Sequence, residues 1–384
     1  MKSWFSPIAI SIMLITSCAA QKAPFTDITW TIAATVQNPD GSPAPGYAGA
    51  INAINNNVLL IAGGANFPDK MPWEGGRKYY SNEVHVLEKS GDKYTWVEGH
   101  KFKLSEAIAY CGNTSTDLGI VYAGGENENG LSAAAGLLIW NAEARKLSVK
   151  QLPKLPQALT NVGLTAINNV VYLAGGDLAD ASSNALYRLD LNKSTGVWET
   201  LKPLPVALAN ALVVAQQGKV YVIGGRSKTA SGISDLHHSS YVYDPATDQW
   251  TSLANISNGT NISNLSAGAG ISLAKDYILV TGGDNGAVFH QIEAHLSKIA
   301  QTTGNTEKAR LTVLKNNLLI NHDGFDRSIL LYDIPKHKWS KVGELPFPAQ
   351  VTTTATKWGE DIVLSNGEVK PGVRTPEVMI GKFK

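Results

Sequence analysis

Cysteine and charge are both scarce in this sequence. Its 384 residues include 2 cysteines, charged residues make up 17% of the chain, and the formal net charge is +1. Binding to nucleic acid needs a concentration of positive charge, which so balanced a composition does not supply. We therefore expect a small or neutral binding partner and no nucleic acid.

Long apolar runs are also lacking, apart from one near the start. The segment MKSWFSPIAISIMLITSC has a lysine, an apolar run (residues 8–15) and then small residues, which is the layout of a secretory signal. The run is too short to cross a bilayer. LITSC also resembles the lipobox of bacterial lipoproteins, so we expect residues 1–17 to be a signal peptide and Cys18 to be lipidated as the first mature residue. An ordinary signal peptide cut near Ala20 is the alternative.

Either interpretation places the protein outside the cytoplasm. We expect it in the periplasm or anchored to the outer membrane, touching the membrane only through a lipid on Cys18. With Cys18 lipidated, Cys111 has no partner for an intramolecular disulfide, even in an oxidising compartment. Stability must then come from the fold.

Glycine and large aromatic residues, by contrast, are plentiful, and they recur in a pattern. The 36 Gly, 9 Trp and 13 Tyr suit many short strands joined by tight turns. Apolar strands that end in a glycine pair follow one another along the chain. They are VLLIAGGAN (58–66), GIVYAGGEN (119–127), VVYLAGGDL (170–178), KVYVIGGRS (219–227), YILVTGGDN (277–285) and, with Asn-Gly instead, DIVLSNGEV (361–369). The second glycines are 61, 51, 49, 58 and 84 residues apart, which indicates six units, one with a large insertion.

Each unit repeats the same order of segments. A small-residue strand precedes the glycine strand, and a loop, a strand such as NALYRLDL and a tryptophan strand such as GVWETL follow it. Four strands, a glycine doublet and a Tyr-to-Trp spacing resemble a kelch-type propeller blade. Such blades bury both faces only when stacked round an axis, where glycine lets crowded backbones approach. The predicted fold class is all-β, a six-bladed kelch-type β-propeller.

The two ends of the chain complement each other. After its glycine strand, the sixth unit has only PEVMIGKF (376–383), so it lacks an outer strand, and ITWTIAATV (28–36) supplies one. Pairing these segments closes the ring and removes two exposed sheet edges. We therefore predict that the last blade is closed by the N-terminal strand, in a single propeller domain over residues 25–384.

The long gap before the sixth doublet contains an insertion near residues 285–310. In FHQIEAHLSKIA (289–300), Ile292, Leu296 and Ile299 recur at helical spacing, so we predict a short amphipathic helix inserted in blade five. A surface helix that fills a groove is one interpretation. A lid or a subunit contact, and with it a homodimer, is the other.

Polar residues follow the glycine doublets, where the loops of a propeller emerge around one mouth of the central channel. This convergence makes the mouth the default binding site. The loops begin at Asn66, Glu126, Asp177, Arg226, Asp284 and Glu368.

The loop SNGEVKPGVRT (365–375) stands out because it carries an acid, Glu368, and an arginine, Arg374, in a stretch bent by two glycines and a proline. Gly367 and Pro371-Gly372 bend the chain, so Glu368 and Arg374 need not point apart. A carboxyl group near the axis can have a pKa raised by burial and act as a general acid or base, and arginine suits a substrate carboxylate. A structural ion pair across the loop explains the same two residues.

This loop is also the strongest link to a known family. NGEVKPGVRT resembles the signature segment of the bacterial N-acetylneuraminate epimerases, also called sialic acid mutarotases. Two further stretches agree: YILVTGGDN, followed after an insertion by LLYDIPKHKWSKVGELPFP, and AGGANFP, followed by YSNEVHVL. In that family the signature segment lies mid-chain with two more blades after it, whereas here those two blades come first. The sequence thus resembles a cyclically permuted variant, which a closed ring tolerates because only the chain ends move.

The resemblance implies an isomerase that interconverts the α and β anomers of N-acetylneuraminate by opening and reclosing the sugar ring. The family's catalytic glutamate and arginine match Glu368 and Arg374. We assign Glu368 the acid–base role and Arg374 the sugar's carboxylate. Ring opening needs a proton taken from the anomeric hydroxyl and one delivered to the ring oxygen, so we expect a small sugar acid as partner and no metal or redox cofactor.

Five further residues are candidates for substrate binding. Arg77 and Arg226 lie in the mouth loops of blades one and four, and His290 lies beside the inserted helix. Asn66 follows the first doublet, and Asn366 is the first residue of the last. Each has a plainer explanation: the arginines as structural ion pairs, His290 as a surface or packing residue, and the asparagines as turn caps.

Other functions predict features of their own. A sialidase would show repeated Ser-x-Asp-x-Gly-x-x-Trp boxes, which this sequence lacks. A kelch-type copper oxidase needs a cysteine crosslinked to tyrosine beside histidine ligands, and Cys111 lies outside such a cluster. A non-enzymatic propeller that binds glycan or protein at its mouth remains the alternative.

Overall fold

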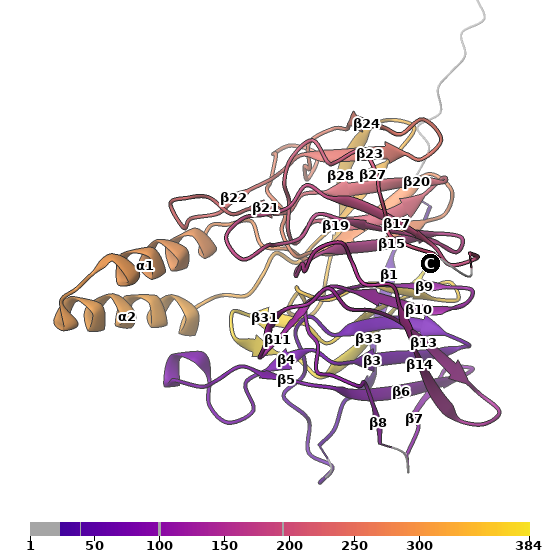
Figure 1. Cartoon of the computed structure of the whole chain (residues 1–384), viewed down its shortest axis with the longest axis horizontal. Helices are drawn as coiled ribbons and strands as arrows, with labels where there is room; N and C mark the ends of the chain where they lie inside the picture. The colour runs from indigo at the N-terminus through magenta and orange to yellow at the C-terminus, as the bar shows by residue number, and fades with distance from the viewer. Residues whose placement is uncertain (1–23, 39, 99–100, 194–195) are drawn as a thin grey trace, which may run out of the picture.

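The fold is a ring of six antiparallel sheets, as predicted, in a computed structural model that describes residues 24–384 except 39, 99–100 and 194–195 (Figure 1). The predicted signal peptide and Cys18 lie outside the described residues. Within the described part of the chain, no helix has the length and apolar character needed to span a membrane. The six sheets are the blades of a β-propeller.

The first three blades each contain four strands in chain order, with the short β8 (Phe102–Lys103) added to blade one. Successive strands pair antiparallel, with a tight turn between the first and second strands of each blade and a longer loop between the second and third. Blade one is β2 (Ile51–Asn55), β3 (Val58–Ala62), β6 (Glu83–Ser90) and β7 (Lys93–Trp96); blade two is β9 (Gly112–Thr116), β10 (Gly119–Ala123), β13 (Ala135–Asn141) and β14 (Lys146–Leu152); blade three is β15 (Gly163–Ile167), β16 (Val170–Ala174), β17 (Leu186–Asp190) and β18 (Glu199–Thr200).

Blades four and five repeat this order, and blade six combines both ends of the chain. In blade six, β1 (Ile28–Thr35) pairs with β33 (Glu377–Phe383), from Ile28 opposite Phe383 to Thr35 opposite Glu377, so the predicted closure is confirmed. The remaining strands are β19 (Leu212–Gln216), β20 (Lys219–Ile223), β23 (Ser240–Asp244) and β24 (Gln249–Ser252) in blade four; β25 (Ala269–Leu273), β26 (Tyr277–Thr281), β27 (Ser328–Asp333) and β28 (Lys338–Glu344) in blade five; and β29 (Thr356–Trp358) and β30 (Asp361–Ser365) in blade six.

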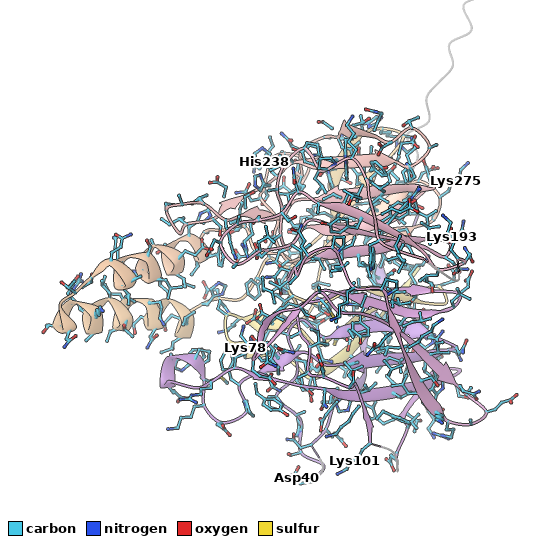
Figure 2. The ribbon with its side chains drawn as sticks, viewed as in Figure 1. Asp40, Lys78, Lys101, Lys193, His238 and Lys275 are labelled. Carbon is cyan, nitrogen blue, oxygen red and sulfur yellow. The ribbon has the colours of Figure 1, made fainter. Side chains whose placement is uncertain are left out.

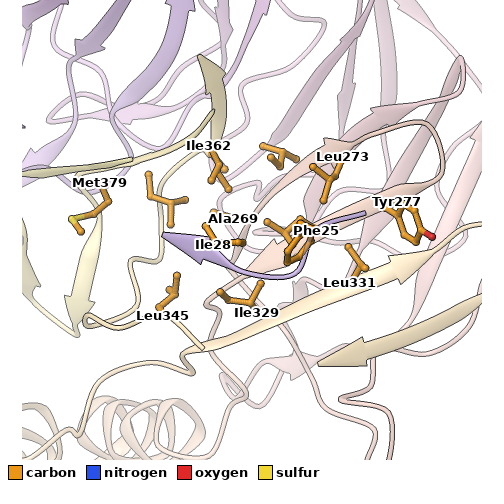
Figure 3. Close-up of a cluster of buried hydrophobic side chains, with 14 of the residues drawn as sticks. Phe25, Ile28, Ala269, Leu273, Tyr277, Ile329, Leu331, Leu345, Ile362 and Met379 are labelled. Atoms are coloured by element: carbon orange, nitrogen blue, oxygen red, sulfur yellow. The ribbon is translucent and has the colours of Figure 1, made fainter. Parts of the chain in front are cut away.

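Six clusters of buried apolar side chains join the blades, one at each interface between neighbours. The cluster between blades five and six packs Leu273 and Ile329 against Ile362 and Met379, with Ile28 of β1 among them (Figure 3). Burying a side chain of this size contributes about 1.5–3 kcal/mol. The N-terminal strand is therefore held by packing as well as by backbone pairing.

The glycine doublets turn the chain where each inner strand pair reaches the mouth. The first residue of each doublet has a φ of 58–71° and the second a φ of 90–110°, which is the region that glycine enters without strain. A Cβ atom on Gly175 would lie 2.1 Å from the Leu208 carbonyl oxygen. In blade six, Asn366 takes the first position at φ 58°, because asparagine tolerates left-handed backbone better than most residues.

A closed ring of six backbone hydrogen bonds surrounds the axis, one residue from each blade. Each N–H donates to the carbonyl oxygen of the preceding blade over 2.7–3.0 Å, and each residue has a φ between 51° and 64°. Left-handed backbone is costly for residues other than glycine, by about 1–3 kcal/mol each, so the ring is held in place by the surrounding blades. Its members, in order, are Gly49, Tyr110, Asn161, Asn210, Ala267 and Thr352.

The insertion in blade five contains two helices rather than the one predicted, and it runs beyond the predicted limit near residue 310. Helix α1 (Phe289–Gln301) packs against α2 (Asn305–Ile320), and both helices follow β26 and precede β27 in the chain. Figure 1 shows the pair projecting from the body of the propeller. The sequence did not reveal α2 because its apolar residues are spread around the helix, with only Leu311 and Leu319 buried.

Candidate active site

The residues that follow the doublets occupy equivalent positions around the mouth. Each pairs with the residue that precedes the inner strand of its own blade, as Glu368 does with Val351 and Asp284 with Ser266. Short hairpins extend four of these positions on the side of the molecule where the helices project (Figure 1). They are β4 (Ala65–Asn66) with β5 (Tyr79–Tyr80), β11 (Glu126–Asn127) with β12 (Gly130–Leu131), β21 (Arg226–Ser227) with β22 (Asp235–Leu236), and β31 (Glu368–Lys370) with β32 (Val373–Arg374).

A cavity of about 560 Å³ opens at this mouth. Its floor includes five of the six residues of the backbone ring, and all six also line a smaller hollow further along the axis. Its charged lining residues come from five blades, and its apolar wall comes from the helices and nearby loops. The charged residues are Lys78, Glu126, Arg226, Asp284, Glu368 and Arg374, and the wall includes Phe67, Phe289, Leu296, Leu319 and Phe325.

Glu368 and Arg374 face each other across the small hairpin of blade six. The two residues pair in its register, and Arg374 Nη2 lies 3.0 Å from Glu368 Oε1. The same oxygen accepts a hydrogen bond from Gly372 N over 3.0 Å, where the turn places glycine at φ 86°. The proline–glycine turn thus brings the carboxylate of Glu368 and the guanidinium of Arg374 together.

The guanidinium of Arg374 is buried but has donor capacity to spare. Its side chain is 4% exposed, and within the described residues Nε and Nη1 have no hydrogen-bond partner. Its central carbon lies 4.7 Å from the centre of the Phe67 ring, a favourable cation–π contact. A buried cation with unused N–H groups favours a ligand that brings acceptors.

Tyr110 and Lys78 bring a hydroxyl and a second cation to the same part of the cavity. Burial raises the pKa of the Tyr110 phenol, and the Glu368 carboxylate adds to this effect while Lys78 and Arg374 oppose it. The Lys78 ammonium lies 4.9 Å from the Tyr110 ring centre and 3.3 Å from Glu126 Oε1. Burial disfavours the charged form of Lys78. The electrostatic attraction of Tyr110, Glu126 and Tyr80 is larger than this penalty, so the pKa of Lys78 is raised. Figure 2 shows Lys78 on the side of the helix pair, opposite Lys193 and Lys275.

Arg226 lies in the cavity wall, but its charge is already matched. Its Nη2 donates to Asp177 Oδ2 over 2.6 Å, and Nη1 reaches Asp177 Oδ1 at 3.5 Å. Asp177 is 1% exposed, and it also accepts hydrogen bonds from Asn161 and Ser182. This pair fastens blade three to blade four.

The remaining predicted residues lie outside the lining of the cavity. Arg77 is exposed on the loop before β5. Asn66 is buried and donates to Gly46 O, and Asn366 is buried and accepts a hydrogen bond from Tyr47 N. His290 is in the first turn of α1, where its Nε2 is buried without a hydrogen-bond partner among the described residues. The structure thus brings Glu368, Arg374 and Arg226 to one cavity and leaves these four apart from it.

Sequence reasoning missed Tyr110, Lys78 and Phe67. Tyr110 precedes the inner strand of blade two and carries no motif, so its place in the floor depends on the ring of backbone hydrogen bonds. Lys78 adjoins Arg77 in the same loop, so the sequence pointed to the loop but not to this residue. Phe67 follows Asn66 directly, in the segment AGGANFP that carries part of the family resemblance.

Residues 152–384 match the sequence model of a family described as N-acetylneuraminate epimerase. The chain belongs to this family. The matched region begins at the end of blade two and contains every strand of blades three to six except β1. That is the arrangement expected if the first two blades here correspond to the last two of other members.

Individual relatives agree with this assignment. The chain is 29% identical over 239 residues to an N-acetylneuraminate epimerase of Yersinia enterocolitica, 28% over 232 residues to one of Haemophilus influenzae and 26% over 258 residues to one of Brucella melitensis. These alignments cover 61%, 60% and 66% of this chain and 58%, 59% and 64% of the relatives. The chain therefore spans about 60% of the length of the relatives it matches.

Proposed function

We propose that this protein interconverts the α and β anomers of N-acetylneuraminate by acid–base-assisted opening of the sugar ring. The observation that carries the proposal is the Arg374 guanidinium, which is buried at the mouth of the cavity beside Glu368 with two donor atoms unused. The names of the relatives support the same substrate. Anomers interconvert unaided, so the acceleration required is modest and positioning with proton transfer can supply it.

The carboxylate of the sugar acid is placed against Arg374. A guanidinium donates charge-assisted hydrogen bonds to carboxylate oxygens, and Nε and Nη1 of Arg374 have no partner among the described residues. Because the carboxylate is bonded to the anomeric carbon, holding it here brings the anomeric hydroxyl close to Glu368. Phe67, Phe289 and Phe325 line the same cavity and offer apolar contacts to the rest of the sugar.

Glu368 acts as the base that removes the anomeric proton. One of its oxygens, Oε1, is occupied by Arg374 and Gly372, so Oε2 is the atom assigned to the substrate. Taking the proton from the anomeric hydroxyl lets the carbonyl form as the bond to the ring oxygen breaks. Reclosure on the opposite face gives the other anomer and returns the proton.

The test follows the anomers of freshly released α-N-acetylneuraminate by NMR. We expect the protein to speed the loss of the α signal. We expect Glu368→Gln to lower the catalysed rate at least about 100-fold. A wild-type protein that leaves the spontaneous rate unchanged contradicts the proposal. Binding of the sugar without acceleration would instead identify a non-enzymatic propeller that recognises glycans.

Cellular location is a separate proposal that rests on the first residues alone. We propose export through residues 1–17 and a lipid anchor at Cys18, because an apolar run followed by small residues and cysteine is typical of a lipoprotein signal. Labelling with a fatty acid should mark the wild-type protein but not Cys18→Ser. Equal labelling of both would contradict the anchor.

A further inference from the structure

We propose that Asp284 is a second catalytic acid–base group, which protonates the ring oxygen while Glu368 deprotonates the anomeric hydroxyl. The inference rests on the proposed function. It assigns the delivery of a proton to the ring oxygen, which the role of Glu368 as base does not explain. Ring opening needs one proton removed and another delivered at two different oxygen atoms, so two groups serve it better than one.

Asp284 and Glu368 occupy the same place in neighbouring blades, directly after the doublet, and both line the mouth cavity. Beneath them the backbone ring joins the two blades, where Thr352 N donates to Ala267 O over 3.0 Å. The two carboxyl groups therefore approach a bound sugar from adjacent sides of one rigid floor.

The other carboxylates at equivalent positions already have cationic partners. Glu126 lies 3.3 Å from Lys78 Nζ, Asp177 lies 2.6 Å from Arg226 Nη2, and Glu368 is paired with Arg374. Among the described residues, Asp284 makes no ion pair.

A backbone donor and two histidines form the near surroundings of Asp284. Its Oδ1 accepts a hydrogen bond from Gly286 N over 2.8 Å. His322 and His290 are the nearby groups that favour its charge. His322 is buried, and burial lowers its pKa, so it is neutral at pH 7. Asp284 therefore has no permanent cation beside it.

Burial gives Asp284 the character of an acid. Loss of solvent raises the pKa of its carboxyl above the ordinary value, and the Gly286 N–H and the two histidines oppose the shift only in part. More of the group is then protonated near neutral pH than for an exposed aspartate. A protonated carboxyl can donate to the ring oxygen.

The two transfers balance. In opening, the Glu368 carboxylate takes the proton of the anomeric hydroxyl, the carbonyl forms, the bond from the anomeric carbon to the ring oxygen breaks, and protonated Asp284 gives its proton to that oxygen. In closing, the hydroxyl attacks the other face of the carbonyl and returns its proton to Asp284, while Glu368 protonates the new anomeric oxygen. Both groups recover their starting states, and no other reactant is consumed.

The experiment compares wild type, Asp284→Asn and Asp326→Asn in the NMR assay for anomer exchange. Asparagine at 284 keeps an oxygen for Gly286 N but carries no transferable proton. We expect kcat to fall by at least about tenfold with KM changed less than about threefold. Asp326 is an exposed carboxylate of the same blade whose Oδ1 caps Ser328 N, so Asp326→Asn is the matched control and should keep both constants.

A rescue measurement separates proton transfer from a structural role. In Asp284→Ala, added formate should restore part of the lost kcat, and thermal melting should show that both variants are folded. An unchanged kcat in Asp284→Asn, or folded variants without any formate rescue, would overturn the role of Asp284. A wild-type protein at the spontaneous rate would instead remove the proposed function itself, so the two failures are distinguishable.

Discussion

Two acid–arginine pairs lie at the mouth of this propeller, and they differ in how far their hydrogen-bonding capacity is used. Asp177 engages Arg226 through both of its oxygens and adds contacts from Asn161 and Ser182. Glu368 engages Arg374 through one oxygen, and two nitrogens of Arg374 remain without a partner among the described residues. We call Asp177–Arg226 the closed pair, because its hydrogen-bonding groups are occupied, and Glu368–Arg374 the open pair, because two of its donors are not.

The difference shows that residue type alone does not identify a binding site. Arginine lines the same cavity in both pairs, yet only Arg374 has buried donors that a ligand can satisfy. Arg226 fastens two blades, which is the structural explanation offered for it from sequence.

Breaking the closed pair should have the largest effect, and the effect should be on stability. Asp177→Asn places an amide where Asn161, Ser182 and Arg226 all donate, so buried donors face one another, and we expect the unfolding free energy to fall by about 3 kcal/mol. Glu368→Gln should cost less than about 1.5 kcal/mol, because the one oxygen in use can still accept from Arg374 and Gly372. Urea unfolding of both variants measures this, and equal losses would contradict the distinction.

Changing the open pair should act on binding instead. Arg374→Lys keeps the charge but loses the planar fork, so we expect KM for N-acetylneuraminate to rise about 30-fold, or about 2 kcal/mol. Arg226→Lys should raise KM by less than about threefold, since the terminal nitrogens of Arg226 already bind Asp177. Anomer-exchange kinetics over a range of substrate concentrations give both values. A larger effect at Arg226 would reverse the assignment of the two pairs.

The repeat pattern predicted most of the fold because each blade is built locally. Glycine doublets, turn spacing and strand alternation all lie within about fifty residues of one another, and the closing strand follows from the missing edge in the sixth unit. The ring of backbone hydrogen bonds was not predictable. It joins residues from six distant segments, and a left-handed φ at Tyr110 or Thr352 runs against their local preference.

The candidate site was predictable only where its residues are close in sequence. Glu368 and Arg374 share a short hairpin, so two bends in the sequence were enough to predict that they need not point apart. Lys78 and Tyr110 come together across blades through the cavity, and no spacing in the chain encodes that contact. Arg77 was predicted as a substrate-binding residue because it lies in a mouth loop, yet it is exposed on the loop before β5 and does not line the cavity.

The smallest expected effect concerns the aromatic face beneath the open pair. The Phe67 ring lies 4.7 Å from the central carbon of Arg374, and such a contact contributes about 0.5–1 kcal/mol by holding the guanidinium in place for the substrate. Phe67→Leu should therefore raise KM about two- to fivefold with kcat nearly unchanged. Phe325→Leu is the matched control, because Phe325 lines the same cavity but packs on His322 rather than Arg374. If the two variants raise KM equally, the ring serves the cavity only as apolar wall, and the open pair depends on its hydrogen bonds alone.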